Sequence, residues 1–224
     1  MAQKVAFKAK SDAEASGELV LPAGGARAPG VVLIQEWWGL NDHIRSLLDR
    51  LAAAGFVALA PDLYHGASTK DPEEAGRLMS ALNKPAALDE IAGAVRFLAG
   101  HERANGKVGV IGFCLGGALA FAAAAAIPEL RAVVPFYGLP SPEPDYSRVK
   151  APILAHFASR DDWAKPEGAE AIRAALASRG KWMDLYVYEA DHAFMNDTRP
   201  EVYSPEAAKL AWDRSVAFLR EHLA

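Results

Sequence analysis

The segment that most constrains this chain runs from Gly112 to Gly117 and reads Gly-Phe-Cys-Leu-Gly-Gly. An apolar run (107–113) precedes Cys114, and an alanine-rich run (118–126) follows it. This order predicts a buried strand, a sharp turn and then a helix. Glycines on both sides of the turn leave room for the strand and the helix to approach each other closely. Cys114 would stand at the turn, where the N-terminus of the helix favours negative charge.

The cysteine itself allows two interpretations. A lone intracellular cysteine is most often a small buried hydrophobic residue. The frame around Cys114, however, matches the nucleophile elbow of α/β-hydrolases, with sulfur in place of the serine oxygen. We therefore predict that Cys114 is a catalytic nucleophile. Because the chain has one cysteine, an intramolecular disulfide and a multi-cysteine metal site are both excluded.

Predicted strands and helices alternate along the chain after a short antiparallel strand pair. The predicted strands cover 5–9, 17–21, 31–36, 56–60, 107–113, 132–137, 152–158 and 183–189, and the predicted helices cover 41–54, 72–82, 85–98, 115–126, 166–178 and 205–223. Such alternation is typical of a mainly parallel sheet with helices on both faces. We expect one α/β-hydrolase domain over residues 1–224, with 64–85 as a candidate cap above the site.

Charge and hydropathy limit the partners. The net charge is −4 with no basic cluster, so binding to nucleic acid or to an anionic membrane surface is not expected. The N-terminus has no apolar signal core, and the longest apolar stretch is too short and too rich in glycine to span a bilayer. We expect a cytoplasmic protein that acts on a small molecule without a cofactor or metal. A monomer is favoured, and a dimer is left open.

Partners for the cysteine follow two later strands, in the chain order that this architecture requires. Asp161 and Asp162 come just after the strand predicted at 152–158, and His192 comes just after the strand at 183–189. His192 would take the thiol proton, and an aspartate would orient its ring. Either aspartate could serve as the acid, and we favour Asp161.

The end of the first buried strand carries a second notable segment, Gln-Glu-Trp-Trp-Gly, which begins at Gln35. In this architecture the corresponding loop supplies one donor of the oxyanion hole. We expect the backbone N–H groups of Trp37 and Leu115 to be these donors. Glu36 has two possible roles: it could accept the thiol proton, or it could be a strand-end glutamate held in a hydrogen bond.

At these residues the chain resembles the dienelactone hydrolase family. The matching segments are Gln35–Asn41, Ala60–Tyr64, Gly112–Gly117, Asp161 and Ala190–Phe194. The resemblance extends from about residue 17 to the final helix. It implies a cysteine hydrolase of lactones or small esters whose triad is Cys114, Asp161 and His192. It also implies that Glu36 contacts the thiol and helps to generate the thiolate when substrate binds.

The substrate is less well defined than the reaction. The family holds the carboxylate of its dienelactone with arginines, but four residues beyond the histidine this chain has Asn196, and Arg199 lies three residues further on. Asparagine cannot replace a bidentate arginine, so the resemblance does not specify dienelactone. We expect a pocket lined by the aromatic residues Trp38, Tyr64, Phe113, Tyr137 and Phe194, together with Asn196.

Three other functions were considered. A dinucleotide-binding oxidoreductase is disfavoured, because the glycines at 109, 112, 116 and 117 do not fit the required spacing. A broad-scope esterase or thioesterase would differ only in substrate. A non-catalytic ligand-binding protein of the same fold would have an unreactive Cys114. The favoured function is a hydrolase that works through an acyl-enzyme on Cys114.

Overall fold

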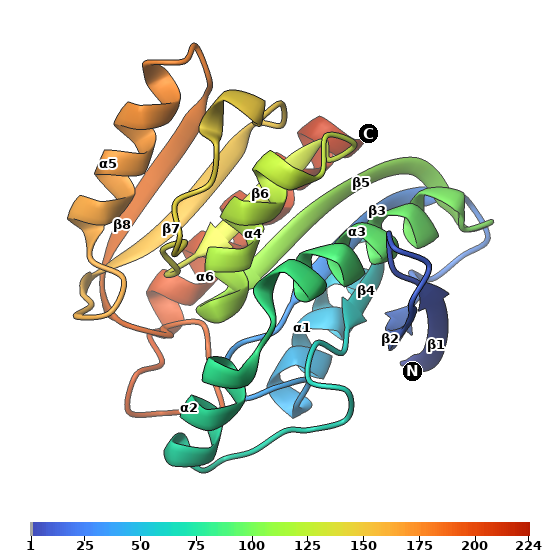
Figure 1. Ribbon diagram of the computed structural model, residues 1–224, viewed down its shortest axis with the longest axis horizontal. Helices are drawn as coiled ribbons and strands as arrows, with labels where there is room; N and C mark the ends of the chain where they lie inside the picture. Colours follow the sequence, from blue (N-terminus) through green and yellow to red (C-terminus); the bar gives the residue numbers. More distant parts are fainter. Residues whose placement is uncertain (1) are drawn as a thin grey trace.

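The computed structural model describes residues 2–224 (Figure 1). The strands are β1 (Gln3–Lys8), β2 (Glu14–Val20), β3 (Ala28–Ile34), β4 (Val57–Pro61), β5 (Ala104–Phe113), β6 (Ala132–Phe136), β7 (Ile153–Arg160) and β8 (Met183–Asp191). The helices are α1 (Asp42–Ala53), α2 (Pro72–Ala81), α3 (Lys84–Gly100), α4 (Leu115–Ala126), α5 (Pro166–Ala177) and α6 (Pro205–Leu223), with a short 3₁₀ helix, η1 (Tyr146–Arg148). The elements follow the predicted order, and most ends differ by one to three residues from the predicted ones.

The strands described in residues 2–224 form one eight-stranded sheet in the order β1-β2-β4-β3-β5-β6-β7-β8. The pairs β1–β2 and β2–β4 are antiparallel, and every pair from β4–β3 to β7–β8 is parallel. The fold is therefore an α/β-hydrolase fold with a mainly parallel sheet, as predicted. The N-terminal pair forms one edge of the sheet, and β8 forms the other.

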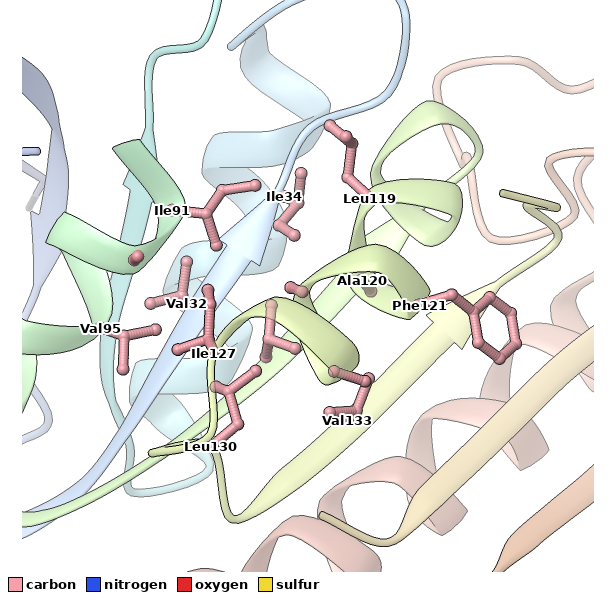
Figure 2. Packing of buried hydrophobic residues seen from close by; sticks show 14 of the residues in the cluster. Val32, Ile34, Ile91, Val95, Leu119, Ala120, Phe121, Ile127, Leu130 and Val133 are labelled. Atoms are coloured by element: carbon pink, nitrogen blue, oxygen red, sulfur yellow. The ribbon is translucent and has the colours of Figure 1, made fainter. Parts of the chain in front are cut away.

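Helices cover both faces of the sheet, and Figure 1 shows α3 and α4 in front of it with α1 and α6 behind. The central strand β3 is buried on both sides because its side chains alternate between the two layers. Val32 and Ile34 pack in the core with α3 and α4, while Val31 and Leu33 pack in the core with α1 and α6. Figure 2 shows the first of these cores, where Val32 lies against Val95.

Local chemistry explains why the helices begin where they do. The side chain of Asn41 caps α1 by accepting a hydrogen bond from Ile44 N at 3.2 Å. Asp71 caps α2 and Asn83 caps α3 in the same way, with proline in the first turn of each helix. Among residues 2–224, none of the helices is both long and apolar enough to cross a membrane.

The parallel strands bring the chemistry-bearing residues to one edge of the sheet. Gln35 follows the last residue of β3, Cys114 that of β5, Tyr137 that of β6, Asp161 that of β7 and His192 that of β8. Because parallel strands end at the same edge, residues far apart in the sequence meet there. The candidate site is built at this edge.

Candidate active site

The turn between β5 and α4 holds Cys114 in an unusual backbone conformation, with φ 54° and ψ −114°. A non-glycine residue at positive φ is strained by about 1–3 kcal/mol and persists only where its surroundings fix it. Here Cys114 N donates to Phe136 O at 3.1 Å, and Cys114 O accepts from Ala118 N at 3.1 Å. These two bonds tie the cysteine to β6 on one side and to α4 on the other.

The glycines around the cysteine have separate structural reasons. A Cβ on Gly112 would lie 2.1 Å from Gly116 O, inside the turn itself. A Cβ on Gly116 would lie 2.3 Å from Ile34 O, and one on Gly117 would lie 2.2 Å from Phe136 O. The N-terminus of α4 thus sits directly against the ends of β3 and β6. Close packing of backbone on backbone explains why the sequence has glycine at all three positions.

The structure brings Cys114, His192 and Asp161 into one hydrogen-bonded chain. His192 Nε2 lies 3.3 Å from Cys114 Sγ, and His192 Nδ1 lies 2.6 Å from Asp161 Oδ2. The other oxygen of Asp161 accepts from the N–H groups of Trp163 and Ala164, at 2.8 and 2.9 Å. Asp161 is therefore fixed on both oxygens.

Asp162, the alternative acid, has an exposed side chain, whereas the Asp161 side chain is fully buried beneath His192. The geometry therefore selects Asp161 as the partner of His192.

The surroundings of Asp161 and His192 favour the charged form of both side chains. Burial opposes the charge on Asp161, but hydrogen bonds from His192 and Ala164 outweigh it and hold the pKa of Asp161 below its usual value. Burial also lowers the pKa of His192, but the hydrogen bonds to Asp161 and Cys114 and their charges raise it to about 10. Both shifts favour a protonated His192 beside an ionised Asp161 at neutral pH.

The predicted donors of the oxyanion hole, the N–H groups of Leu115 and Trp37, belong to two elements that meet beside Cys114. Leu115 is the first residue of α4, and the first N–H groups of a helix have no acceptor within it. Trp37 lies in the turn just past β3, which the close approach of Gly116 to Ile34 O brings against the start of α4. The two donors come from different elements that only the fold brings together.

Glu36 is almost fully buried, and its Oε2 accepts from Asn196 Nδ2 at 2.8 Å. Asn196 is held in turn by Thr198, which donates to its Oδ1 from the backbone N and from Oγ1. Within the described residues, Glu36 Oε1 has no hydrogen-bond partner, and no hydrogen bond joins Glu36 to Cys114. Burial, with Glu36 and Cys114 nearby, raises the pKa of Tyr137. Glu36 is thus a buried carboxylate just past the end of β3, near Tyr137 and held by the amide of Asn196.

A cavity of about 870 Å³ opens on the triad. Cys114, His192 and Tyr137 line its reactive end, together with Trp163 and Ala164 from the loop after β7. Trp163 is 77% exposed, which is unusual for so large an apolar side chain. Sequence analysis did not identify Trp163, although its position two residues after Asp161 was the available signal.

Most of the predicted pocket residues do not line this cavity, and the prediction of an aromatic pocket needs correction. Among the residues that the structure describes, Tyr137 lines it, whereas Trp38, Tyr64, Phe113, Phe194 and Asn196 do not. The phenylalanine rings are fully buried in the core beside Phe136, and Asn196 is engaged with Glu36. Their place in the sequence near strand ends did not reveal that their side chains turn toward the core.

Arg199 does not take the place of a substrate-binding arginine in this cavity. Its guanidinium lies over the Trp38 ring at 5.6 Å and bonds to Glu201 at 2.8 Å. Among the described residues, the arginine that lines the cavity is instead Arg148, in η1.

The other histidines lie outside the reactive end. His156 is fully buried within β7, as expected for an interior group. His65 lies in a separate polar hollow, 3.5 Å from Glu90, and does not approach Cys114. His43 is buried in α1 with its Nδ1 3.4 Å from Asp197.

Comparisons with known proteins agree with this geometry. The model of the "Dienelactone hydrolase family" matches residues 16–223. The chain is 38% identical to "Protein usf" of Aquifex pyrophilus, with all of both chains covered. It is 32% identical to the carboxymethylenebutenolidase of Pseudomonas putida, over 93% of this chain and 92% of that one. A crystal structure of P91, a dienelactone hydrolase-like promiscuous phosphotriesterase from metagenomic libraries, superimposes with a TM-score of 0.90 at 25% identity, covering 100% of this chain and 99% of that one.

Proposed function

Because this chain belongs to the dienelactone hydrolase family, we propose that it opens lactones or small carboxylic esters through a thioester on Cys114. Family membership makes the chain a carboxylic ester hydrolase. The observation that supports the finer proposal is the hydrogen-bonded chain Cys114–His192–Asp161 at the wall of a cavity.

In the first half of the reaction, His192 Nε2 accepts the proton of the Cys114 thiol. The sulfur attacks the carbonyl carbon, and the carbonyl oxygen becomes an oxyanion that the N–H groups of Trp37 and Leu115 stabilise. As the tetrahedral intermediate collapses, the bond from carbon to the ester oxygen breaks. His192 gives its proton to the departing alkoxide, and a thioester remains on Cys114.

In the second half, His192 Nε2 takes a proton from water as the water oxygen attacks the thioester carbonyl. The carbon–sulfur bond then breaks, the acid product leaves, and the proton returns to the sulfur. Asp161 holds the His192 ring with Nε2 toward the sulfur throughout, and its negative charge stabilises the imidazolium that each step forms.

Glu36 has a second proposed role in this scheme, as an acceptor of the thiol proton. Only one of its two oxygens is bonded, and the carboxylate lies near Tyr137, which lines the cavity together with Cys114. A carboxylate released from Asn196 by substrate would be free to take the thiol proton before His192 does. We propose this role on the resemblance and on the unbonded oxygen together.

Replacing the nucleophile tests the proposal. Cys114→Ala should lower the hydrolysis of p-nitrophenyl acetate and of dihydrocoumarin, a simple lactone, by at least about 10³-fold, because the covalent route is lost. The variant should keep the circular dichroism and melting temperature of the wild type, since alanine is smaller and removes no hydrogen bond of the backbone. Turnover that survives in the folded variant would place the nucleophile elsewhere.

A further inference from the structure

We infer that the substrate of this enzyme carries an extended apolar chain, which lies in a groove along α4 that begins at the nucleophile. The inference rests on the proposed function and adds the class of substrate. A small lactone would occupy only the reactive end of a cavity of about 870 Å³, a volume near the upper limit of about 1,000 Å³ for sites of drug-sized ligands. The rest of the cavity is large enough to accommodate a longer acyl chain.

The floor of the groove is one row of residues on α4. Cys114, Ala118, Ala122 and Ala126 stand four residues apart, so each lies next to the following one and the row winds slowly around the helix. All four are half-buried, and all four line the cavity that contains the nucleophile. The row therefore leads directly away from the reactive sulfur.

The walls of the groove come from two other parts of the chain. Met79, Leu82 and Leu88, from the α2–α3 region, line one part of the cavity. Leu139 and Pro140, from the segment between β6 and η1, line another. These side chains are apolar and only partly buried, so the groove offers an unfilled apolar surface continuous with the triad.

Ala118 and Ala122 are not part of the core between α4 and the sheet, whereas Ala126 both packs against that core and lines the cavity. A different set, Ala120, Ala123 and Ala124, is buried in the core, and Figure 2 shows Ala120 among its side chains. Since the row from Ala118 to Ala126 faces the cavity, larger side chains there would fill it. Small residues on this side keep the groove open beside the nucleophile.

The length of the row sets the length of the chain that it accommodates. Twelve positions separate Cys114 from Ala126, which corresponds to about 18 Å at 1.5 Å per helical residue. An extended hydrocarbon chain advances about 1.25 Å per carbon, so about fourteen carbons span this distance and about ten reach the level of Ala122. The lining also includes Lys84, Glu143, Asp145 and Arg148, which carry charges of both signs.

A series of p-nitrophenyl esters of increasing acyl length tests the inference. For the wild-type enzyme, kcat/KM should rise at least about 10-fold from the acetate to the octanoate or decanoate, because each added methylene is removed from water in the groove. Hydrolysis of the acetate with a flat length profile would overturn this inference and leave the proposed function standing. Loss of all ester turnover would instead overturn the proposed function.

Blocking the groove at two depths gives a sharper form of the test. Ala122→Phe should reduce the decanoate-to-acetate ratio of kcat/KM by about 10-fold and shift the best substrate to short chains. Ala126→Phe, one turn further from the sulfur, should reduce the ratio only for the longest esters. Ala174→Phe, on the exposed side of α5, adds the same ring outside the groove and should leave the ratio as in the wild type.

The depth dependence separates a groove from general damage. A cut-off in chain length that moves outward from Ala122→Phe to Ala126→Phe supports the inference. Equal losses for every ester in both folded variants would overturn it. If Ala122→Phe does not fold, as its melting curve would show, the wild-type length profile and Ala126→Phe still decide the question.

Discussion

Two histidines at neighbouring strands, fully buried His156 and half-buried His192, have opposite electrostatics. Burial lowers the pKa of both rings. For His192, at the end of β8, the partners Asp161 and Cys114 reverse the effect and raise the pKa to about 10. For His156, within β7, the nearby Arg214 adds to the effect of burial, and the pKa falls to about 3. The nearest charge, and not the burial, decides which ring can carry a proton.

The hydrogen bonds of His156 show how a neutral ring is held. Ser215 Oγ donates to Ala211 O at 2.7 Å, so it accepts from His156 Nε2–H at 3.0 Å. The other ring nitrogen, Nδ1, then accepts from the Tyr188 hydroxyl at 2.8 Å. The Tyr188 oxygen in turn accepts from Arg214 at 3.1 Å. Each of these side chains has a hydrogen-bond partner. His156 therefore links β7, β8 and α6 and has a structural role.

The largest expected effect, on kcat, comes from removing the carboxylate beside His192, which leaves this ring without a carboxylate partner, as His156 is. Asp161→Asn removes the carboxylate and presents an amide that no longer fixes the productive tautomer. We expect kcat to fall by about 10³- to 10⁴-fold, as for other catalytic triads, with the fold retained. Steady-state kinetics on p-nitrophenyl acetate measures the loss.

Asp162→Asn is the matched control, because it makes the same change at the neighbouring exposed carboxylate. Its kcat should stay within about threefold of the wild type, since Asp162 does not hold His192. A larger loss in Asp162→Asn than in Asp161→Asn would reverse the assignment of the acid.

A smaller effect, on stability instead of turnover, is expected at the other histidine. His156→Gln leaves at least one of Tyr188 and Ser215 without its partner in the core. We expect the free energy of unfolding to fall by about 2–3 kcal/mol, and kcat to stay within about threefold. Urea unfolding at pH 7.5 measures the first quantity.

The same variant gives a pH dependence of defined sign. In the unfolded chain a histidine binds a proton below about pH 6.5, whereas folded His156 stays neutral until about pH 3. The stabilisation from the neutral ring is therefore complete above about pH 6.5 and is lost as the pH falls toward 3. The difference in unfolding free energy between wild type and His156→Gln should shrink by about 1–2 kcal/mol between pH 7.5 and 5. A difference that widens on acidification would contradict the low pKa of His156.

The sequence predicted the strand–turn–helix at Cys114 and the order of the triad because these features are local. Each depends on a short run of residues. The residue that follows each parallel strand lies at the same edge of the sheet, so the order of the triad can be predicted from the order of the strands. Strand ends were less well predicted. β8 continues through Asp191, two residues beyond its predicted end, because Asp191 pairs with Arg160 in the register of β7 and β8.

Neither the groove nor the contacts of Glu36 could be predicted from the sequence, and the reason is physical. An apolar helix such as α4 shows no polar side, so its periodicity cannot distinguish the row packed on the sheet from the row that lines a cavity. Part of the alanine run packs on the sheet, and part of it lines the cavity. Likewise Glu36 meets Asn196 across 160 residues of sequence, a contact that only the assembled sheet creates.

The most direct test of the account is to look for the covalent intermediate. Wild-type enzyme mixed with excess p-nitrophenyl ester, quenched in acid within the first turnovers and digested, is examined by mass spectrometry. The account predicts an acyl group on the peptide that contains Cys114 and none on the same peptide from Cys114→Ala. An acyl group on another residue, or ester turnover with an unmodified Cys114 under conditions where deacylation limits the rate, would contradict it.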